Sequence, residues 1–435
     1  MTLPARLKST VMLALLTSVL PLNATLTAVA LLRQKVSGSD PARAPDPKTI
    51  LVSGGKMTKS LQLARSFHMA GHRVIMVEAE KYRLTGHRFS RAVDRFYTVP
   101  KPDRGGYADA LVEIVIKEGV DVYVPVCAPA ASVYDSEAMA ALEEHCEVLH
   151  FDPATIARLD DKGRFAEEAE ALGLSTPDAV RITDPRQVLN FDFSRSKNPY
   201  ILKSIPYDPL YRLDLTRLPR ESPAETEAFV RSLPISEEKP WVLQEFIEGQ
   251  EYCTHSTVRR GRVQLHCCCE SSAFQINYEM VDRPDIEDWV KRFVEGLDLT
   301  GQVSLDFIAN GDSVYAIECN PRTHSAITMF YDHPGVAASY LEDGVDEIRP
   351  TDSSRPTYWL YHELWRLARE PSSASRRIRT IARGKDAIFQ WDDPLPFLMV
   401  HHLQIPSLLI ESLRQGTDWI KLDFNIGKLV EAGGD

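Results

Sequence analysis

Residues 304–326 read SLDFIANGDSVYAIECNPRTHSA, and this stretch sets the expectation for the fold. Two largely apolar runs flank Asn310-Gly311, a dipeptide typical of the tight turn of a β-hairpin. A hairpin centred there places Asp306 and Glu318 nearly opposite each other, and strand alternation puts Asn320 on the same face as Glu318. Strands disfavour Asp and Asn, and buried carboxylates are costly unless a positive group lies between them. The pattern therefore predicts a metal ion or a lysine at this point.

The three side chains would offer a cation two carboxylates and one amide oxygen. Hard oxygen ligands of this kind suit Mg²⁺, or Mn²⁺ as a second choice. Mg²⁺ usually keeps substrate phosphates among its ligands, so the site predicts a nucleotide that arrives with the metal. Phosphates need positive partners, and Lys162, Lys203 and Arg322 are the candidates.

The bulk composition limits the class of partner. A chain of 435 residues predicts about two to four domains. Its net charge of −11 argues against a nucleic-acid partner, which would need a basic face. Seven cysteines, three of them adjacent at 267–269, form no disulfide pattern and indicate a reducing compartment. Adjacent residues of a strand point to opposite faces, so these three thiols are poorly placed to share one metal ion.

Residues 10–32, TVMLALLTSVLPLNATLTAVALL, carry no charge and are long enough to span a bilayer. Three interpretations stay open: a secretory signal with Ala28-Val29-Ala30 as its cleavage motif, a retained anchor, or a helix lying on a membrane or against the protein. The odd number of cysteines and the predicted nucleotide site argue against secretion. We therefore favour a retained anchor or a membrane-associated segment on a cytoplasmic catalytic domain. Basic residues on both flanks leave its orientation undetermined.

The rest of the chain divides into segments that differ in composition and hydrophobic pattern. Residues 50–77 read as strand, helix and strand around a Ser-Gly-Gly turn, a β-α-β unit that predicts a parallel sheet. The expected fold class is α/β, with an α+β arrangement in the nucleotide-binding part. The expected segments are an apolar segment at 1–35, a linker at 36–48, an α/β domain at 49–152, a small subdomain at 153–240, a large subdomain with the metal site at 241–345, and a C-terminal extension at 346–435 that packs as an appendage.

Five features follow one another along the chain in a recognisable order. They are Asp161-Lys162 inside one helix closed by Gly173, a strand ending in Lys203, QEFIEGQEY at 244–252, an acidic strand, and ECNPR at 318–322. This order resembles the ATP-grasp superfamily, which includes the carboxylate–amine ligases, over roughly residues 48–345. The resemblance implies the ATP-grasp fold with an N-terminal pre-ATP domain, and an ATP-dependent ligase that forms a C–N bond.

The resemblance also implies roles for the residues that match the motifs. Lys162 and Lys203 would hold the ATP phosphates, and Arg322 would stabilise the transferred phosphoryl group or the reacting acceptor, which makes Lys203 and Arg322 the expected catalytic residues. The expected ligands of Mg²⁺ are Asp306, Glu318 and Asn320. The expected adenine hinge is Glu245, Phe246 and Ile247, next to Gln244, and Glu251 would hold the ribose hydroxyls.

One departure from the family concerns the lid over the phosphates. Many members carry a Gly-rich loop after the second lysine, whereas residues 204–220 contain no glycine. Ser204, Tyr207 and Arg212 are the candidates for its role.

Three stretches carry a closer resemblance within the family. They are CESSAFQINYEMVDRPDIEDWV at 269–290, GQVSLDFI at 301–308 and AIECNPRTHSAITMFYDHPG at 316–335, together with the apolar N-terminus. They are similar to the ATP-grasp ligases of mycosporine biosynthesis, which join glycine to 4-deoxygadusol and give mycosporine-glycine. This implies two small-molecule partners, an acceptor and an amino-acid amine, and leaves a homodimer open.

The acceptor is expected between the first domain and the ECNPR segment. The candidate contacts are Ser53, Gly54, Gly55, Lys56, His324 and Ser325. For His324, hydrogen bonding to the backbone is a simple structural alternative. Two other functions stay open: an amino-acid or peptide ligase that activates a carboxylate, and a membrane-tethered nucleotide-binding protein without turnover.

Overall fold

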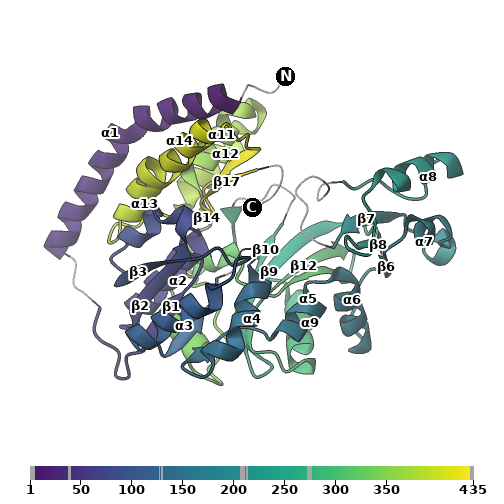
Figure 1. The fold of residues 1–435 in the computed structure, drawn as a ribbon, viewed down its shortest axis with the longest axis horizontal. Helices are drawn as coiled ribbons and strands as arrows, with labels where there is room; N and C mark the ends of the chain where they lie inside the picture. The colour runs from purple at the N-terminus through teal and green to yellow at the C-terminus, as the bar shows by residue number, and fades with distance from the viewer. Residues whose placement is uncertain are drawn as a thin grey trace.

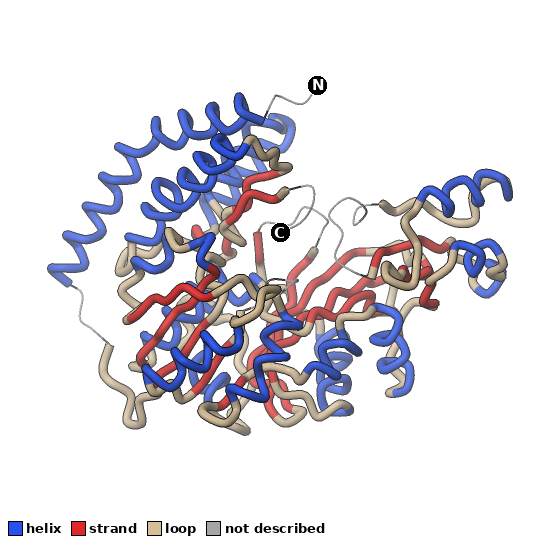
Figure 2. Tube along the Cα trace, in the orientation of Figure 1, coloured by secondary structure: helices blue, strands red, loops and turns tan. Residues whose placement is uncertain are grey.

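The computed structural model describes residues 5–37, 41–126, 128, 131–205, 211, 214–271 and 277–431. A long N-terminal helix, α1 (Ala5–Ser37), runs along the outer edge of the molecule (Figure 1). Strands run through the middle of the molecule and helices cover them from outside (Figure 2). Three of the sheets position the candidate site.

The first sheet is parallel throughout, as the β-α-β pattern predicts. Its strand order is β3-β2-β1-β4-β5. The strands are β1 (Thr49–Val52), β2 (Arg73–Ala79), β3 (Arg95–Val99), β4 (Val122–Val124) and β5 (Glu147–Val148), and the helices are α2 (Thr58–Met69), α3 (Tyr107–Glu118) and α4 (Ser132–Leu142), with 3₁₀ turns η1 (Glu80–Tyr82) and η2 (Gly86–Phe89). Ile50 packs into one core and Leu51 into another, so β1 is covered on both faces.

The segment that carries Lys162 forms two helices where the sequence pattern predicts one. α5 (Pro153–Leu159) ends and α6 (Lys162–Ala171) begins across Asp160-Asp161. The Asp161 carboxylate accepts hydrogen bonds from the backbone N–H groups of Gly163 and Arg164, which is the N-cap of a new helix. Lys162 is therefore the first residue of a helix, not an interior one.

A small antiparallel sheet follows, with strand order β6-β8-β7. Its elements are β6 (Ala179–Ile182), α7 (Pro185–Leu189), η3 (Phe193–Arg195), β7 (Tyr200–Ser204), α8 (Pro223–Ser232) and β8 (Trp241–Glu245). It has its own core around the buried Tyr200 and Trp241. Of the three lid candidates, Ser204 ends β7, whereas Tyr207 and Arg212 lie outside the described residues.

The third sheet is antiparallel, with order β10-β9-β12-β13 and helix α9 (Pro284–Gly296) packed on it. Its strands are β9 (Gln250–Arg259), β10 (Arg262–Glu270), β12 (Gly301–Asn310) and β13 (Ser313–Asn320). The cysteine run lies on β10, where Cys267 and Cys269 belong to one core and Cys268 to the other. The adjacent thiols thus face opposite sides of the sheet, as strand alternation predicts.

The C-terminal segment is part of the main core, which corrects the expectation of an appendage. Phe397, Leu409 and Leu429 belong to the same hydrophobic core as Ile50 and Leu61 of the parallel-sheet region. The elements beyond the third sheet are η4 (Ser325–Phe330), α10 (Val336–Leu341), α11 (Leu360–Arg369), η5 (Pro371–Ser373), α12 (Ala374–Arg383), α13 (Leu395–Met399), the π-helical η6 (Val400–Gln404), α14 (Ile405–Gln415), and the short strands β11 (Asn277–Tyr278), β14 (Thr357–Tyr358), β15 (Lys385–Asp386), β16 (Lys421–Asp423) and β17 (Lys428–Val430).

Candidate active site

The β12–β13 hairpin brings the three predicted metal ligands to one face of the sheet. Asp306 pairs directly with Glu318, and Ser304 pairs with Asn320. Gly311 in the turn has φ of 59°, a conformation that glycine adopts without strain. The predicted hairpin and its register are therefore confirmed.

Two lysines from other elements approach this pair. Lys162 Nζ lies 2.9 Å from Glu318 Oε1. Lys203, at the end region of β7, is half-buried, and desolvation lowers its pKa even though Glu318 and Asp306 lie close enough to act against this shift. The structure thus gathers two ammonium groups and two carboxylates from α6, the small sheet and the hairpin.

The two carboxylates respond to this environment in opposite directions. Burial raises the pKa of Asp306, and the neighbouring charge of Glu318 raises it further. Burial is also the largest single influence on Glu318 and opposes its ionisation. Lys162, Lys203 and Arg322 together outweigh burial, so the pKa of Glu318 stays lowered.

The donor set fits a divalent cation that is only partly enclosed by protein. Two carboxylates lie side by side, and their mutual repulsion is the feature that a cation would relieve. Asn320 Nδ2 lies 3.3 Å from Asp306 Oδ2, which places the amide next to the carboxylates. Within the described residues no group of three or more His, Cys, Asp or Glu side chains could hold a metal. A cation here would therefore complete its ligand shell with phosphate and water oxygens.

Asp306→Asn should make the metal-free protein more stable at neutral pH while removing its response to Mg²⁺. Above the ordinary Asp pKa of about 4 the unfolded chain ionises freely at this position, whereas the folded wild type opposes ionisation of Asp306. The stability difference should be absent at low pH and grow as pH rises, because the raised pKa makes the wild type lose stability over that range. We expect a Tm higher by roughly 1–3 °C at neutral pH.

Thermal unfolding of both proteins, with and without Mg²⁺, at several pH values checks this result. Mg²⁺ should stabilise the wild type more at higher pH, because a carboxylate must lose its proton to bind a metal. Equal stabilisation of Asp306→Asn by Mg²⁺ would contradict the metal assignment.

Arg322 is held at the edge of the same cluster. Its guanidinium donates to Asp160 Oδ1 at 3.0 Å and, through a short hydrogen bond, to Asn320 Oδ1. Asp160 lies in the break between α5 and α6, so the break both starts the Lys162 helix and positions the arginine. The sequence analysis missed Asp160, although the adjacent Asp-Asp pair before Lys162 was a visible capping signal.

The residues of the predicted hinge make internal contacts that restrict how it can bind adenine. The backbone N–H of Glu245 donates to Asp178 O and that of Phe246 to Pro199 O, both at 2.7 Å. The Glu245 carboxylate accepts hydrogen bonds from the side chains of Ser196 and Asn198. Two of the three hinge amides are thus used within the protein.

Gln244 and Glu251 lie on either side of the hinge. Gln244 is buried and donates to Ile317 O at 3.3 Å, which ties the small sheet to the hairpin. Glu251 pairs in register with Ile308 on β12, and its charge acts on Lys203. Glu251 therefore lies on the phosphate side of the hinge, and its predicted ribose contact stays a prediction.

The first group of predicted acceptor residues, 53–56, makes its polar contacts within the protein. Ser53 Oγ accepts a hydrogen bond from Val126 N at 3.0 Å, and Lys56 Nζ pairs with Glu78 Oε1 at 3.2 Å. Gly54 has φ of +67°, and a Cβ there would lie 2.2 Å from Val126 O, so glycine is required. Gly55 O is contacted by the side chains of Thr85 and His87. These contacts support a structural role for 53–56.

The second group lies directly beyond the metal ligands. Burial lowers the pKa of His324 to about 3, and its neutral Nδ1 accepts a hydrogen bond from Ala326 N at 3.3 Å. This is the structural alternative, with a backbone amide as the partner. Ser325 Oγ lies 3.0 Å from Asn425 Oδ1.

Lys59 links the two groups and was missed by the sequence analysis. Its side chain is buried, and Nζ donates to Thr323 O at 2.6 Å, so the first turn of α2 is held against the ECNPR loop. On the same sheet face, the buried His255 Nε2 and Ser304 Oγ have no hydrogen-bond partner among the described residues. No local pattern marks Lys59, because its contact with Thr323 joins segments more than 200 positions apart.

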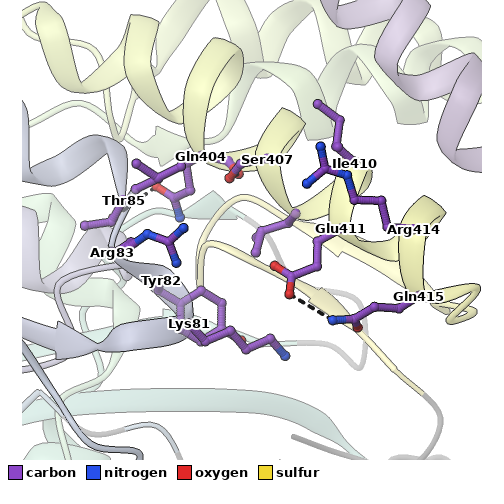
Figure 3. A pocket seen from close by; sticks show the side chains of 12 residues that line it. Lys81, Tyr82, Arg83, Thr85, Gln404, Ser407, Ile410, Glu411, Arg414 and Gln415 are labelled. Atoms are coloured by element: carbon purple, nitrogen blue, oxygen red, sulfur yellow. Dashed lines mark hydrogen bonds between the residues drawn. The ribbon is translucent and has the colours of Figure 1, made fainter.

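A cavity of about 350 Å³ lies away from this cluster, between residues 81–85 and α14 (Figure 3). Gln404 closes one side by accepting from Gly86 N at 2.7 Å, and Glu411 accepts from Gln415 across the rim. The predicted site residues are not among those that line it. The cavity is therefore separate from the candidate active site.

Comparisons with known proteins agree with this geometry. A family model described as the ATP-grasp domain matches residues 220–326, which include all three predicted metal ligands and Arg322. The carbamoyl phosphate synthase large chain of Vibrio cholerae is 24% identical over 197 residues, which are 40% of this chain and 17% of that protein. The chain thus spans less than a fifth of that relative.

Two solved structures with bound nucleotides share the fold. N5-carboxyaminoimidazole synthetase from Staphylococcus aureus, complexed with ADP, matches with a TM-score of 0.53 and 14% identity over 73% of this chain and 82% of that chain. Biotin carboxylase from Campylobacter jejuni, in a β-γ-ATP complex, matches with a TM-score of 0.52 and 12% identity over 69% and 72% of the two chains. The chain has the ATP-grasp fold, and its residues 220–326 match the ATP-grasp domain model.

Proposed function

We propose that this protein is an ATP- and Mg²⁺-dependent ligase that forms a C–N bond between an acceptor and an amine. The observation that carries the proposal is the convergence of Lys162 and Lys203 on the paired carboxylates Asp306 and Glu318. Two ammonium groups beside two carboxylates suit a nucleotide triphosphate with its divalent cation. The ATP-grasp match over this hairpin supports the same activity.

The reaction would use the protein mainly to position charged groups. The γ-phosphoryl group of ATP passes to an oxygen of the acceptor, and ADP leaves. The amine nitrogen then forms the C–N bond as the C–O bond breaks, which releases phosphate, and the amine proton goes to solvent. Mg²⁺, held by Asp306, Glu318 and Asn320, would neutralise charge on the phosphates.

The basic residues have distinct places in this scheme. Lys162 and Lys203 would bind the phosphates in the nucleotide complex, where Lys162 would exchange its contact with Glu318 for a phosphate oxygen. Arg322, fixed by Asp160, presents a planar guanidinium that suits the transferred group. The acceptor would lie toward Lys59 and Thr323, on the first domain's side of the hairpin.

A finer proposal concerns the substrates. We propose glycine as the amine and 4-deoxygadusol as the acceptor, with mycosporine-glycine as the product. The support is the resemblance of residues 269–290, 301–308 and 316–335 to the ligases of mycosporine biosynthesis. The alternative is a carboxylate acceptor, as in the amino-acid and peptide ligases, and the described side chains favour neither.

Multiple-turnover release of ADP should require both an acceptor and an amine, because the amine consumes the phosphorylated acceptor. A screen pairs glycine and other amino acids with 4-deoxygadusol and with a panel of carboxylates, and mass spectrometry identifies each product. We expect a glycine adduct of 4-deoxygadusol with one ADP released per product. If products form only with carboxylate acceptors, a carboxylate–amine ligase replaces the finer proposal. If no pair releases ADP, the result favours a nucleotide-binding protein without turnover.

A further inference from the structure

The helix α1 is apolar around most of its circumference, and its outward side exposes large apolar side chains. Its buried positions are Ser9, Leu16, Asn23, Thr27 and Ala30, and three of them are polar. Its outward side carries the α1 stripe, defined as Leu7, Val11, Leu15, Leu22, Val29 and Leu32, whose residues are 44–71% exposed. A helix in water normally turns its apolar side inward. One apolar side of α1 instead faces the surroundings of the molecule.

The inward side of α1, which carries both polar and apolar residues, is docked on the C-terminal helices. Asn23 Nδ2 donates to Tyr361 Oη at 2.7 Å and lies 2.8 Å from His402 Nε2. Ser9 Oγ accepts from Trp419 Nε1 at 2.9 Å. α1 also packs along α13, η6 and α14, which Figure 1 shows beneath it. The helix is therefore held lengthwise against the protein.

The hydroxyl groups on the outer side need no external partner. Thr10, Thr17 and Thr25 each donate to the carbonyl four residues earlier at 2.8 Å, and Ser18 donates to Leu15 O at 2.7 Å. Such hydrogen bonds satisfy a hydroxyl within its own helix. The outer side thus combines large apolar side chains with polar groups that are already satisfied, which suits hydrocarbon.

Both ends of α1 carry positive charge next to tryptophan. Lys8 Nζ lies 3.8 Å from the centre of the Trp419 ring, beside the exposed Ile420. Arg33 lies 5.5 Å from the ring centre of Trp391, whose side chain is also exposed. The 33 residues of α1 include no Asp or Glu. Tryptophan with basic residues is typical of the headgroup region of a bilayer. The exposed Trp391 beside Arg33 fits this at one end of α1, whereas Trp419 beside Lys8 is buried against the helix.

We propose that the α1 stripe is a docking surface for a lipid bilayer with anionic headgroups, on which α1 lies in the plane of the membrane. The docked inward side and the basic residues at both ends favour this arrangement over a spanning helix. A second copy of the chain is the other candidate occupant, but the stripe offers it neither acidic groups nor free hydrogen-bonding groups. The proposal does not depend on the ligase activity.

Flotation of the full chain with vesicles tests the proposal. The wild type should float with vesicles of phosphatidylcholine and phosphatidylserine, and less with phosphatidylcholine alone, and added salt should weaken the first more than the second. In the triple variant Leu15→Ser, Leu22→Ser, Val29→Ser, the fraction of protein bound to vesicles should be at least tenfold lower than in the wild type. Its ADP release and thermal midpoint in solution should match the wild type, because these side chains face outward.

A matched control removes three exposed apolar side chains from other elements. Ile116→Ser, Val133→Ser, Leu215→Ser should float like the wild type. Wild-type protein that stays unbound with both vesicle types, or a stripe variant that floats normally, would overturn the proposal. A dimer that the stripe variant dissociates, without flotation of the wild type, would assign the surface to a second copy. Bound protein that resists carbonate extraction would indicate a spanning helix and would overturn the in-plane arrangement.

Discussion

Glu318→Ala will leave a folded protein whose ATP-dependent product formation falls by on the order of 100- to 1000-fold, as expected for one lost preorganised electrostatic contact of about 3–4 kcal/mol. Glu318 is the carboxylate that stays ionised, because Lys162 lowers its pKa, whereas burial raises the pKa of Asp306. It is therefore the stronger of the two anionic ligands for a cation at this site.

The fold should survive the change because Glu318 is partly exposed and the strand pairing of β13 uses only the backbone. Loss of the carboxylate leaves Lys162 without this partner but also removes the like charge beside Asp306. Circular dichroism and thermal unfolding would confirm the folded state, and ADP release with mass spectrometry would measure the reaction. The dependence of the residual rate on Mg²⁺ should shift to higher concentrations.

Two further variants make the result specific. Asp312→Ala removes an exposed carboxylate from the turn of the same hairpin and should retain full activity. Glu318→Gln keeps the size and an acceptor for Lys162 but removes the charge, and should behave like the alanine variant. Activity near the wild type in either Glu318 variant would refute the metal assignment.

Lys203→Ala should raise the KM for ATP by on the order of 30- to 100-fold, the scale of a charge-assisted hydrogen bond of about 2–3 kcal/mol. Lys203 is a half-buried ammonium group, and desolvation lowers its pKa despite the nearby Glu318. A phosphate that binds beside it adds a further opposite charge to those of Glu318, Glu251 and Asp306. The ammonium form of Lys203 is therefore more stable with a phosphate bound beside it than in the nucleotide-free site.

The pH dependence follows from the direction of that shift. Only the protonated amine attracts phosphate, so the affinity for ATP should fall as pH rises through the lowered pKa of Lys203, earlier than for an ordinary lysine. In Lys203→Ala this decline should disappear. Isothermal titration with a non-hydrolysable ATP analogue at several pH values would measure both effects.

Lys239→Ala is the matched control, because Lys239 is an exposed lysine close to β8 of the same small sheet. It should bind the ATP analogue as the wild type does. Unchanged ATP affinity in Lys203→Ala, or a similar loss in Lys239→Ala, would contradict the phosphate role of Lys203.

The hairpin could be predicted from sequence because every signal for it is local. Asn310-Gly311 fixes the turn, and strand alternation then determines that Asp306 meets Glu318. The parallel sheet was predictable for the same reason, since one β-α-β unit specifies its direction. The helix break at Asp160-Asp161 was also local, but the continuous apolar pattern of 154–172 masked the capping signal.

Other parts of the site depend on long-range contacts that no local pattern contains. Lys59 reads as one of several lysines after a glycine turn, and only the packing of α2 on the ECNPR loop brings it to Thr323. Lys56 was predicted to contact the acceptor, but in the structure it forms an ion pair with Glu78, near the end of β2. The position of a side chain follows from its own strand or helix, whereas its partner follows from the packing of distant elements.

The shared core of the first sheet and the C-terminal segment has a consequence for the order of synthesis. Ile50 and Leu61 are translated long before their packing partners Phe397, Leu409 and Leu429. The nascent parallel sheet therefore waits with an uncovered apolar face for most of translation, a state that binds holdase chaperones. A ribosome stalled before codon 397 should display this face, and release of the finished chain should close it.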